Sequence, residues 1–344
     1  MGKLSVTALV LLGVAATACA ATPPPAPTTI AEATIDRWDP AMDAIVPKDW
    51  KIEKLAEGFG WAEGPIWVKS GGYLLFTDVP GNKMWKWSDK GGLEKFLDPS
   101  GAAGADPAIW REAGANGLAL DGPGAILIAD TGNRGIQKLD LKTKKKTPVA
   151  MSFEGKKFAS PNDVTRMSNG VVFFSDPPYG FKKFDDAPQI EIKFNGVYRL
   201  GTDGKVTAIE KELHRPNGVA LSPDEKTLYV AQSEPTQAII NAYSLDANGN
   251  VTGKKLFADV TDLVNDKSPG LPDGLTVAAD GTIFTSGPGG ILVISKEGKR
   301  LGRISDGRPT ANCKFGDDGK TLYLTSKDML ARIRLNVSGI GFGK

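Results

Sequence analysis

Six positions along the chain carry an oxygen-bearing side chain at the same place in a recurring pattern. A polar residue, usually followed by glycine, precedes an alternating apolar run, a turn and a second apolar run. The polar residues are Glu63, Asn116, Asn162, Asn217, Asp273 and Asn312. Taken singly, an Asn-Gly or Asp-Gly pair is typical of a tight turn. At one shared repeat position, however, oxygen donors without histidine or cysteine favour a site for a hard divalent cation, for which Ca²⁺ is the first expectation.

The elements that would position these side chains are short strands. The pattern recurs at steps of roughly 40 to 55 residues, which indicates an array of small units. One unit has room for four strands separated by turns, over residues 116–120, 125–129, 136–141 and 146–150. The sequence therefore predicts an all-β fold, a six-bladed β-propeller of four-stranded antiparallel blades, in which equivalent inner residues meet at the axis. A two-sheet sandwich is the alternative, but it does not predict six copies of one corner.

The N-terminal stretch is predicted to be an export signal over residues 1–20. Lys3 precedes an apolar run that is too short for a membrane span. Two processing routes fit the following residues. The segment Ala16-Thr17-Ala18-Cys19 resembles a bacterial lipoprotein box in which Cys19 would be acylated, whereas cleavage after Ala20 would release the chain. Both routes predict a periplasmic protein, whose only membrane link would be a lipid on Cys19.

The remaining chain divides into three expected parts. Residues 21–49 are predicted to be a Pro-rich tether, residues 50–337 the propeller, and residues 338–344 a C-terminal tail. The 42 basic and 40 acidic residues nearly balance, so no nucleic-acid partner is expected. Cys313 lies in a predicted strand and is expected to be a buried thiol rather than part of a disulfide framework. We expect a monomer.

Two long loops are predicted to form the rim of a pocket. Residues 98–114 form an insert that carries Trp110, and residues 177–189 form a loop in which prolines stiffen the backbone before Tyr179. The single histidine, His214, is not expected to belong to a catalytic triad, because no Gly-x-Ser-x-Gly motif accompanies it.

Several motifs together resemble the gluconolactonase, or senescence-marker-protein (regucalcin), family, in its bacterial gluconolactonase branch. They are Glu63-Gly64-Pro65-x-Trp67, Ser160-Pro161-Asn162-Asp163-Val164, Ser175-Asp176-Pro177-Pro178-Tyr179-Gly180, Arg215-Pro216-Asn217-Gly218, Leu271-Pro272-Asp273-Gly274, Thr310-Ala311-Asn312-Cys313 and Phe315-Gly316-Asp317-Asp318-Gly319. The resemblance covers about residues 50 to 336. It implies a six-bladed propeller with one divalent cation at the axis, usually Ca²⁺, that hydrolyses sugar lactones.

The resemblance also implies roles for individual residues. Glu63, Asn217 and Asp273 match cation ligands of the family, and Asp273 matches its proposed base. Asn162 matches a further ligand or an amide that faces the substrate. Asp163 would orient the residues that bind the cation. Asn116 and Asn312 share the repeat position without a firm family role, so we expect them to line the pocket.

One departure concerns the substrate. The animal branch has an arginine two residues before the asparagine of its Asn-Asp pair, whereas this chain has Ser160 there. The identity of the lactone is therefore left open.

The expected activity is hydrolysis of a lactone or ester, in which the cation polarises the carbonyl and Asp273 assists the attack of water. Zn²⁺, Mn²⁺ and Fe²⁺ remain alternatives to Ca²⁺. Two competing functions stay open at this point. One is a paraoxonase-like or phosphotriesterase-like esterase on the same scaffold, and the other is an exported propeller that binds a ligand without catalysis. A propeller that only binds a ligand would not need both Glu63 and Asp273 at the axis.

Overall fold

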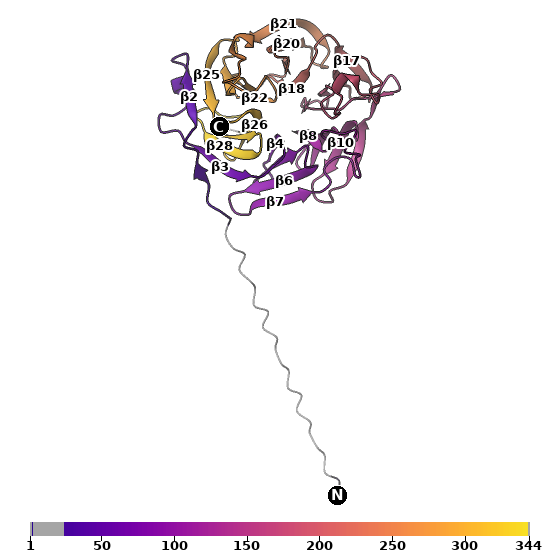
Figure 1. Ribbon diagram of the computed structural model, residues 1–344, viewed down its shortest axis with the longest axis horizontal. Coiled ribbons are helices and arrows are strands. Elements are labelled where there is room, and N and C mark those ends of the chain that lie inside the picture. The colour runs from indigo at the N-terminus through magenta and orange to yellow at the C-terminus, as the bar shows by residue number, and fades with distance from the viewer. Residues whose placement is uncertain (1, 3–23, 343–344) are drawn as a thin grey trace.

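In the computed structural model, six small antiparallel sheets stand around a common axis (Figure 1). The predicted six-bladed propeller is therefore confirmed. The structure describes residue 2 and residues 24–342. The export signal, apart from Gly2, and Cys19 lie outside the described residues, so both processing routes stay predictions. Within residues 24–342 no helix is long and apolar enough to cross a membrane.

Four blades consist of strands that follow one another along the chain. The first blade contains β4 (Ala62–Val68), β5 (Tyr73–Asp78), β6 (Lys83–Ser88) and β7 (Gly92–Leu97). The second blade contains β8 (Ala115–Leu120), β9 (Ala125–Asp130), β10 (Gly135–Asp140) and β11 (Lys146–Ala150). The third blade contains β14 (Val164–Arg166), β15 (Val172–Asp176), β16 (Gly196–Leu200) and β17 (Val206–Glu210). The fourth blade contains β18 (Pro216–Leu221), β19 (Thr227–Gln232), β20 (Ile239–Leu245) and β21 (Val251–Asp259). Connecting segments hold β12 (Ser152–Phe153), β13 (Lys156–Lys157) and the 3₁₀ turns η1 (Phe184–Asp186) and η2 (Thr261–Leu263).

The last two blades are completed by strands from the N-terminal segment. The fifth contains β22 (Leu275–Val277), β23 (Ile283–Gly287), β24 (Gly290–Ile294), β25 (Arg300–Ser305) and, on its edge, β2 (Thr34–Arg37). The sixth contains β26 (Thr310–Gly316), β27 (Thr321–Ser326), β28 (Met329–Arg334), β3 (Ile52–Glu57) and β1 (Thr28–Thr29). The antiparallel pairing of β3 with β28 joins an N-terminal strand to a C-terminal one and closes the ring.

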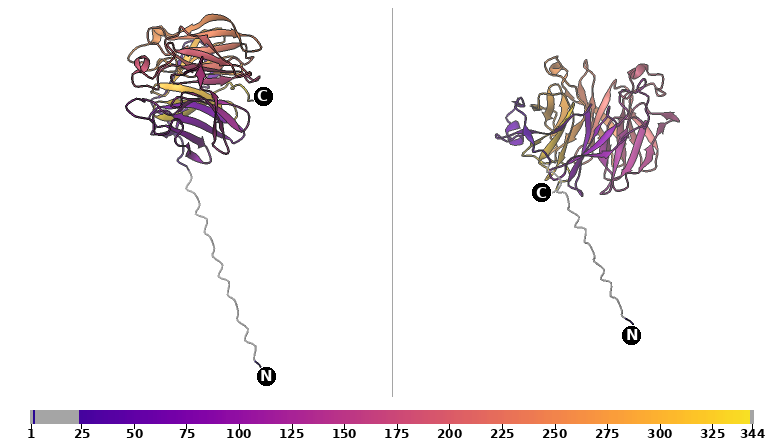
Figure 2. Two further views of the ribbon diagram at one scale, coloured as in Figure 1. Left: turned by 90° about the vertical axis from the view of Figure 1, so that its right-hand side faces the viewer. Right: turned by 60° about the horizontal axis from the view of Figure 1, so that its bottom comes forward.

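The structure differs from the expected tether over residues 21–49. From β1 onward this segment lies on the outside of the ring, where β2 pairs with β25 (Figure 1 and Figure 2). The short helix α1 (Met42–Ile45) follows β2 along the chain. Met42, Ile45 and Val46 are buried in the core between the fifth and sixth blades. The boundary expected at residue 50 is therefore too late. The sequence did not predict this packing, because the apolar residues of the segment are widely spaced among Pro, Thr and Asp and show no regular period.

The expected C-terminal tail also contacts the propeller within the described residues. Gly339 forms an isolated β-bridge with Ala278, and Phe342 packs against two core clusters. Residues 343–344 lie outside the described residues.

Substitution of Met42 by alanine is expected to lower the free energy of unfolding by about 2–4 kcal/mol, because a fully buried side chain would leave a cavity. Urea denaturation followed by circular dichroism measures the change. Lys48→Ala, in the same segment but exposed, is the control and is expected to change stability by less than about 0.5 kcal/mol. Equal stability of Met42→Ala and the unchanged protein would mean that the segment does not contribute to the core.

Candidate active site

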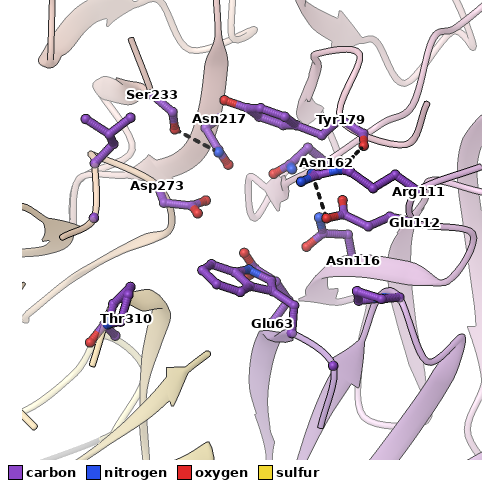
Figure 3. A pocket seen from close by; sticks show the side chains of 16 residues that line it. Glu63, Arg111, Glu112, Asn116, Asn162, Tyr179, Asn217, Ser233, Asp273 and Thr310 are labelled. Atoms are coloured by element: carbon purple, nitrogen blue, oxygen red, sulfur yellow. Dashed lines mark hydrogen bonds and ion pairs between the residues drawn. The ribbon is translucent and has the colours of Figure 1, made fainter. Parts of the chain in front are cut away.

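The first strands of the six blades pack against one another around the axis, and a pocket of about 570 Å³ opens at one end of it. Five of the six repeated polar residues line this pocket: Glu63, Asn116, Asn162, Asn217 and Asp273. Figure 3 shows their side chains converging from different blades. Positions that are roughly 50 residues apart in sequence are thereby brought to one site.

Four of the repeated corners are not tight turns. In β4, β8, β18 and β26 the pairing with the next strand shifts register at the corner, so each of these corners is a bulge inside an inner strand. The corners at Asn162 and Asp273 precede β14 and β22. The following glycine is needed because the neighbouring blade lies against it. A Cβ on Gly218 would stand 2.1 Å from the backbone oxygen of Asp273, and one on Gly64 would stand 2.1 Å from that of Asn116. The corner thus serves close packing of adjacent blades and aims the preceding side chain at the axis.

Asn312 does not line the pocket, contrary to expectation. Its amide nitrogen donates to Glu63 Oε2 at 3.3 Å, and its Oδ1 accepts from the backbone N–H of Cys313 at 2.8 Å. It lies deeper along the axis, in a small cavity that Asp163 and Lys314 also line. Asn312 therefore supports Glu63 rather than facing a ligand.

Trp110 does not line the pocket either. Its ring packs on Phe181 with a centroid distance of 4.7 Å, and the two residues form a β-bridge that joins the two predicted rim loops. Tyr179, in contrast, lines the pocket as expected, and its enclosed position raises the pKa of its hydroxyl. The wall is thus built from both loops, but Trp110 holds it together from behind.

Ser160 is hydrogen-bonded to the second of these loops. Its hydroxyl donates to the backbone oxygen of Pro177 at 2.6 Å and accepts from the N–H of Gly180 at 3.0 Å. The residue that replaces the arginine of the animal branch therefore fixes the loop that carries Tyr179.

Asp163 lies beneath the pocket and ties two blades together. Its carboxylate accepts the backbone N–H groups of Val164 and of Val219, both at 2.9 Å. Burial raises the pKa of Asp163 to about 6, although these two hydrogen bonds oppose the shift. Asp163 therefore links the third and fourth blades beneath the pocket, and its expected role in orienting the cation-binding residues stays a prediction.

The two axial carboxylates lack a cationic partner among the described residues. Burial raises the pKa of Glu63 to about 8, and the backbone N–H of Gly64 offsets this only in part. Burial, together with the nearby charge of Glu63, raises the pKa of Asp273 well above its usual range. Asp273 is partly exposed to the pocket. Both carboxylates would be stabilised by a positive charge between them.

Two amide oxygens also lack partners. Asn116 Oδ1 and Asn217 Oδ1 are buried without a hydrogen bond in the described structure. The orientation of Asn217 is set by Ser233, whose hydroxyl donates to the backbone oxygen of Pro272 at 2.6 Å and must therefore accept from Asn217 Nδ2 at 2.9 Å. The oxygen of Asn217 is left facing the pocket. A buried acceptor without a donor is costly unless a ligand satisfies it.

These donors fit a hard divalent cation. They are all oxygens, two are anionic, and two are unsatisfied amides. In the described part of the chain no three Asp, Glu, His or Cys side chains form a metal-binding group, so a cation here needs the amide oxygens as well.

Several pocket residues escaped the sequence reasoning. Arg111 and Glu112 follow Trp110 in the insert, Ser233 follows β19, and Trp61 precedes β4. The charged Arg-Glu pair in a loop otherwise rich in Ala, Gly and Pro was the available signal for the first two. His214 lies outside this pocket, exposed and paired with Glu234, in line with the expectation that it forms no triad. Cys313 is a buried free thiol, as expected.

The fold and site define a class of six-bladed propellers with a polar pocket at one end of the axis. A family model described as the SMP-30/Gluconolactonase/LRE-like region matches residues 61–328. The chain belongs to this family, and the resemblance deduced from the motifs is confirmed.

Similar proteins include one curated enzyme and two solved structures. The gluconolactonase of Zymomonas mobilis is 42% identical over 309 residues, which cover 89% of this chain and 87% of that protein. A gluconolactonase structure from Xanthomonas campestris is 27% identical with a TM-score of 0.77, covering 92% of this chain and 99% of that one. A calcium-binding regucalcin from Agrobacterium tumefaciens has a TM-score of 0.63 at 19% identity, covering 83% of this chain and 94% of that one, and shows the shared fold alone.

Proposed function

We propose that this protein is a lactone hydrolase of the gluconolactonase type that works with one divalent cation in the axial pocket. The cation is held by Glu63, Asn162, Asn217 and Asp273, with Asn116 Oδ1 as a further donor. The observation that carries this proposal is the ring of two uncompensated carboxylates and two unsatisfied amide oxygens. Similarity to the Zymomonas gluconolactonase over most of both chains supports the lactone as substrate.

Hydrolysis requires that water attack the lactone carbonyl carbon, that the ring C–O bond break, and that the released alkoxide gain a proton. A bound divalent cation supplies Lewis-acid polarisation of a carbonyl oxygen. Asp273, partly exposed at the pocket wall, accepts a proton from the attacking water or holds that water in position. Trp61 and Tyr179 enclose the ring of the substrate and exclude bulk solvent from one side. The product is the open hydroxy acid.

Ca²⁺ is proposed as the cation because every candidate ligand is an oxygen and the ligands come from several blades. Zn²⁺, Mn²⁺ and Fe²⁺ are the alternatives that the following experiment compares.

Removal of the cation by a chelator is expected to abolish lactone opening, and one ion is expected to restore it. Proton release from D-glucono-δ-lactone, followed with a pH indicator, measures turnover after dialysis against chelator and after addition of Ca²⁺, Mn²⁺, Zn²⁺ or Fe²⁺. Any truncation that removes the export signal should retain residue 24 onward, because β1 pairs with β3. Turnover that survives complete chelation would contradict the role of the cation. Ion binding without turnover of any lactone would instead support a non-catalytic binding protein.

A further inference from the structure

The pocket wall opposite Asp273 is built by two loops that lie against each other. The backbone N–H groups of Arg111 and Glu112 both donate to the backbone oxygen of Gly180, at 2.8 and 3.1 Å, and Lys182 N–H donates to Ile109 at 3.0 Å. With the packing of the Trp110 ring on Phe181, these bonds make the wall a small paired structure rather than a free loop. Side chains on it are therefore held at defined positions.

Glu112 projects from this wall into the pocket beside Asn116 (Figure 3). Its side chain is 10% exposed. Arg111 Nη2 stands 2.6 Å from Glu112 Oε1, and Arg111 Nε donates to the backbone oxygen of Tyr179 at 3.0 Å. The guanidinium also lies over the ring of Phe184, 5.1 Å from its centroid. Arg111 therefore positions Glu112 and Tyr179 together.

Glu112 is separate from the ring of oxygen donors. It comes from the insert between the first two blades and not from an inner strand. Together with Glu63 and Asp273 it does not form a metal-binding group of three acidic side chains among the described residues. Burial raises the pKa of Glu112 to about 7, while Arg111 opposes this shift. Glu112 thus presents a buried carboxylate to the pocket from a loop, whereas the proposed cation ligands come from the repeated corners.

An ionised carboxylate accepts hydrogen bonds at about four lone-pair sites and donates none. Arg111 contacts one oxygen of Glu112, so further sites are available to a ligand. Around it the pocket is lined by aromatic and apolar side chains: Trp61, Pro80, Tyr179, Leu271 and Pro309. A carbohydrate-like ring presents the complementary surface, since its C–H faces suit aromatic and apolar walls and its hydroxyl groups donate to a carboxylate.

From this wall we infer that Glu112, held by Arg111, accepts hydrogen bonds from the hydroxyl groups of the substrate and makes the pocket selective for polyhydroxylated lactones. This inference rests on the proposed lactone hydrolysis and names the group that selects its substrate class. Glu112 takes no part in bond breaking, so its loss should affect substrates according to their hydroxyl groups.

The test compares two six-membered lactones that differ in their hydroxyl groups, D-glucono-δ-lactone and δ-valerolactone, with the full-length cation-loaded protein. Glu112→Gln keeps the size of the side chain and removes its charge. We expect kcat/KM for the sugar lactone to fall by at least about tenfold, mainly through a higher KM, because a hydrogen bond to a charged group is weakened. The value for δ-valerolactone should change by less than about twofold.

Asp106→Asn is the matched control, since Asp106 is exposed on the same insert and its Oδ1 accepts the N–H of Ala108, which an asparagine can also do. It should leave both lactones unaffected. Glu112→Asp keeps the charge but shortens the side chain by one carbon. We expect an intermediate loss of kcat/KM for the sugar lactone, so this variant still tests the inference if Glu112→Gln unfolds.

Three results would decide against the inference. Equal losses for both lactones would indicate a structural role for Glu112, and no loss for either would remove it from substrate binding. If the unchanged protein opens D-glucono-δ-lactone but not δ-valerolactone, the comparison is made on the sugar lactone. A lower kcat at constant KM in Glu112→Gln would then overturn the inference. Failure of the unchanged protein to open any lactone would instead refute the proposed function itself, so the two failures are distinguishable.

Discussion

Asp273→Asn is expected to lower kcat/KM for lactone opening by about a thousandfold or more while the protein still folds. The substitution keeps the shape of the side chain but removes the group that accepts a proton from water. It also removes one of the two negative charges that would hold the cation. Initial rates with D-glucono-δ-lactone at saturating cation measure the effect, and circular dichroism verifies the β-rich fold.

The folding behaviour of this variant separates two roles for the site. Without cation, Asp273→Asn should melt no lower than the unchanged protein, because the repulsion between Glu63 and Asp273 is relieved. Asp280→Asn, exposed on the same blade, is the control and should leave both rate and melting temperature unchanged. Retained turnover in Asp273→Asn would exclude the proposed base, and a variant that fails to fold would favour a structural cation.

Glu63→Gln is expected to weaken cation binding by about a hundredfold or more, with a parallel loss of turnover. The amide can still accept the N–H of Gly64, so the bulge at the start of β4 should persist. What is lost is the negative charge that Glu63 contributes to the cation site. Isothermal titration calorimetry with Ca²⁺ measures the affinity, and mass spectrometry after dialysis measures the bound ion.

Glu94→Gln provides the comparison for this experiment, because Glu94 lies on the outer strand of the same blade and pairs with Lys86 at the surface. Its cation content and affinity should match those of the unchanged protein. If Glu63→Gln binds as much cation as this control does, Glu63 is not a ligand, and the proposed set must be rebuilt around the amide oxygens and Asp273.

The sequence could predict the fold because propeller blades are local structures. Each blade consists mostly of strands adjacent in sequence, so alternation and turn residues carry the information for each hairpin. The repeat then indicates how many blades there are. The same locality explains why the five corner residues of the pocket were found, since every blade places its corner at the same end of the ring.

Features that depend on contacts between distant segments were not predictable in this way. The packing of Met42 and Ile45 against the fifth and sixth blades has no local signature in a segment that reads as a tether. Trp110 was expected in the pocket because it is aromatic and lies in a loop. The loop pairs with residues near Gly180, and this pairing decides which of its side chains enters the pocket. Glu112 lines the pocket, whereas Trp110 packs on Phe181 outside it.

By itself, the sequence determined the class of fold, the family and the ring of oxygen-bearing corners, because these follow from periodicity and residue type. Only the tertiary structure decided that Asn312 supports Glu63 from below, that Ser233 turns the oxygen of Asn217 toward the pocket, and that Arg111 holds Glu112 in its wall. Each of these depends on the orientation of one side chain relative to atoms far away in the sequence. Such an orientation is set by packing and hydrogen bonding in the closed ring, and no local pattern encodes it.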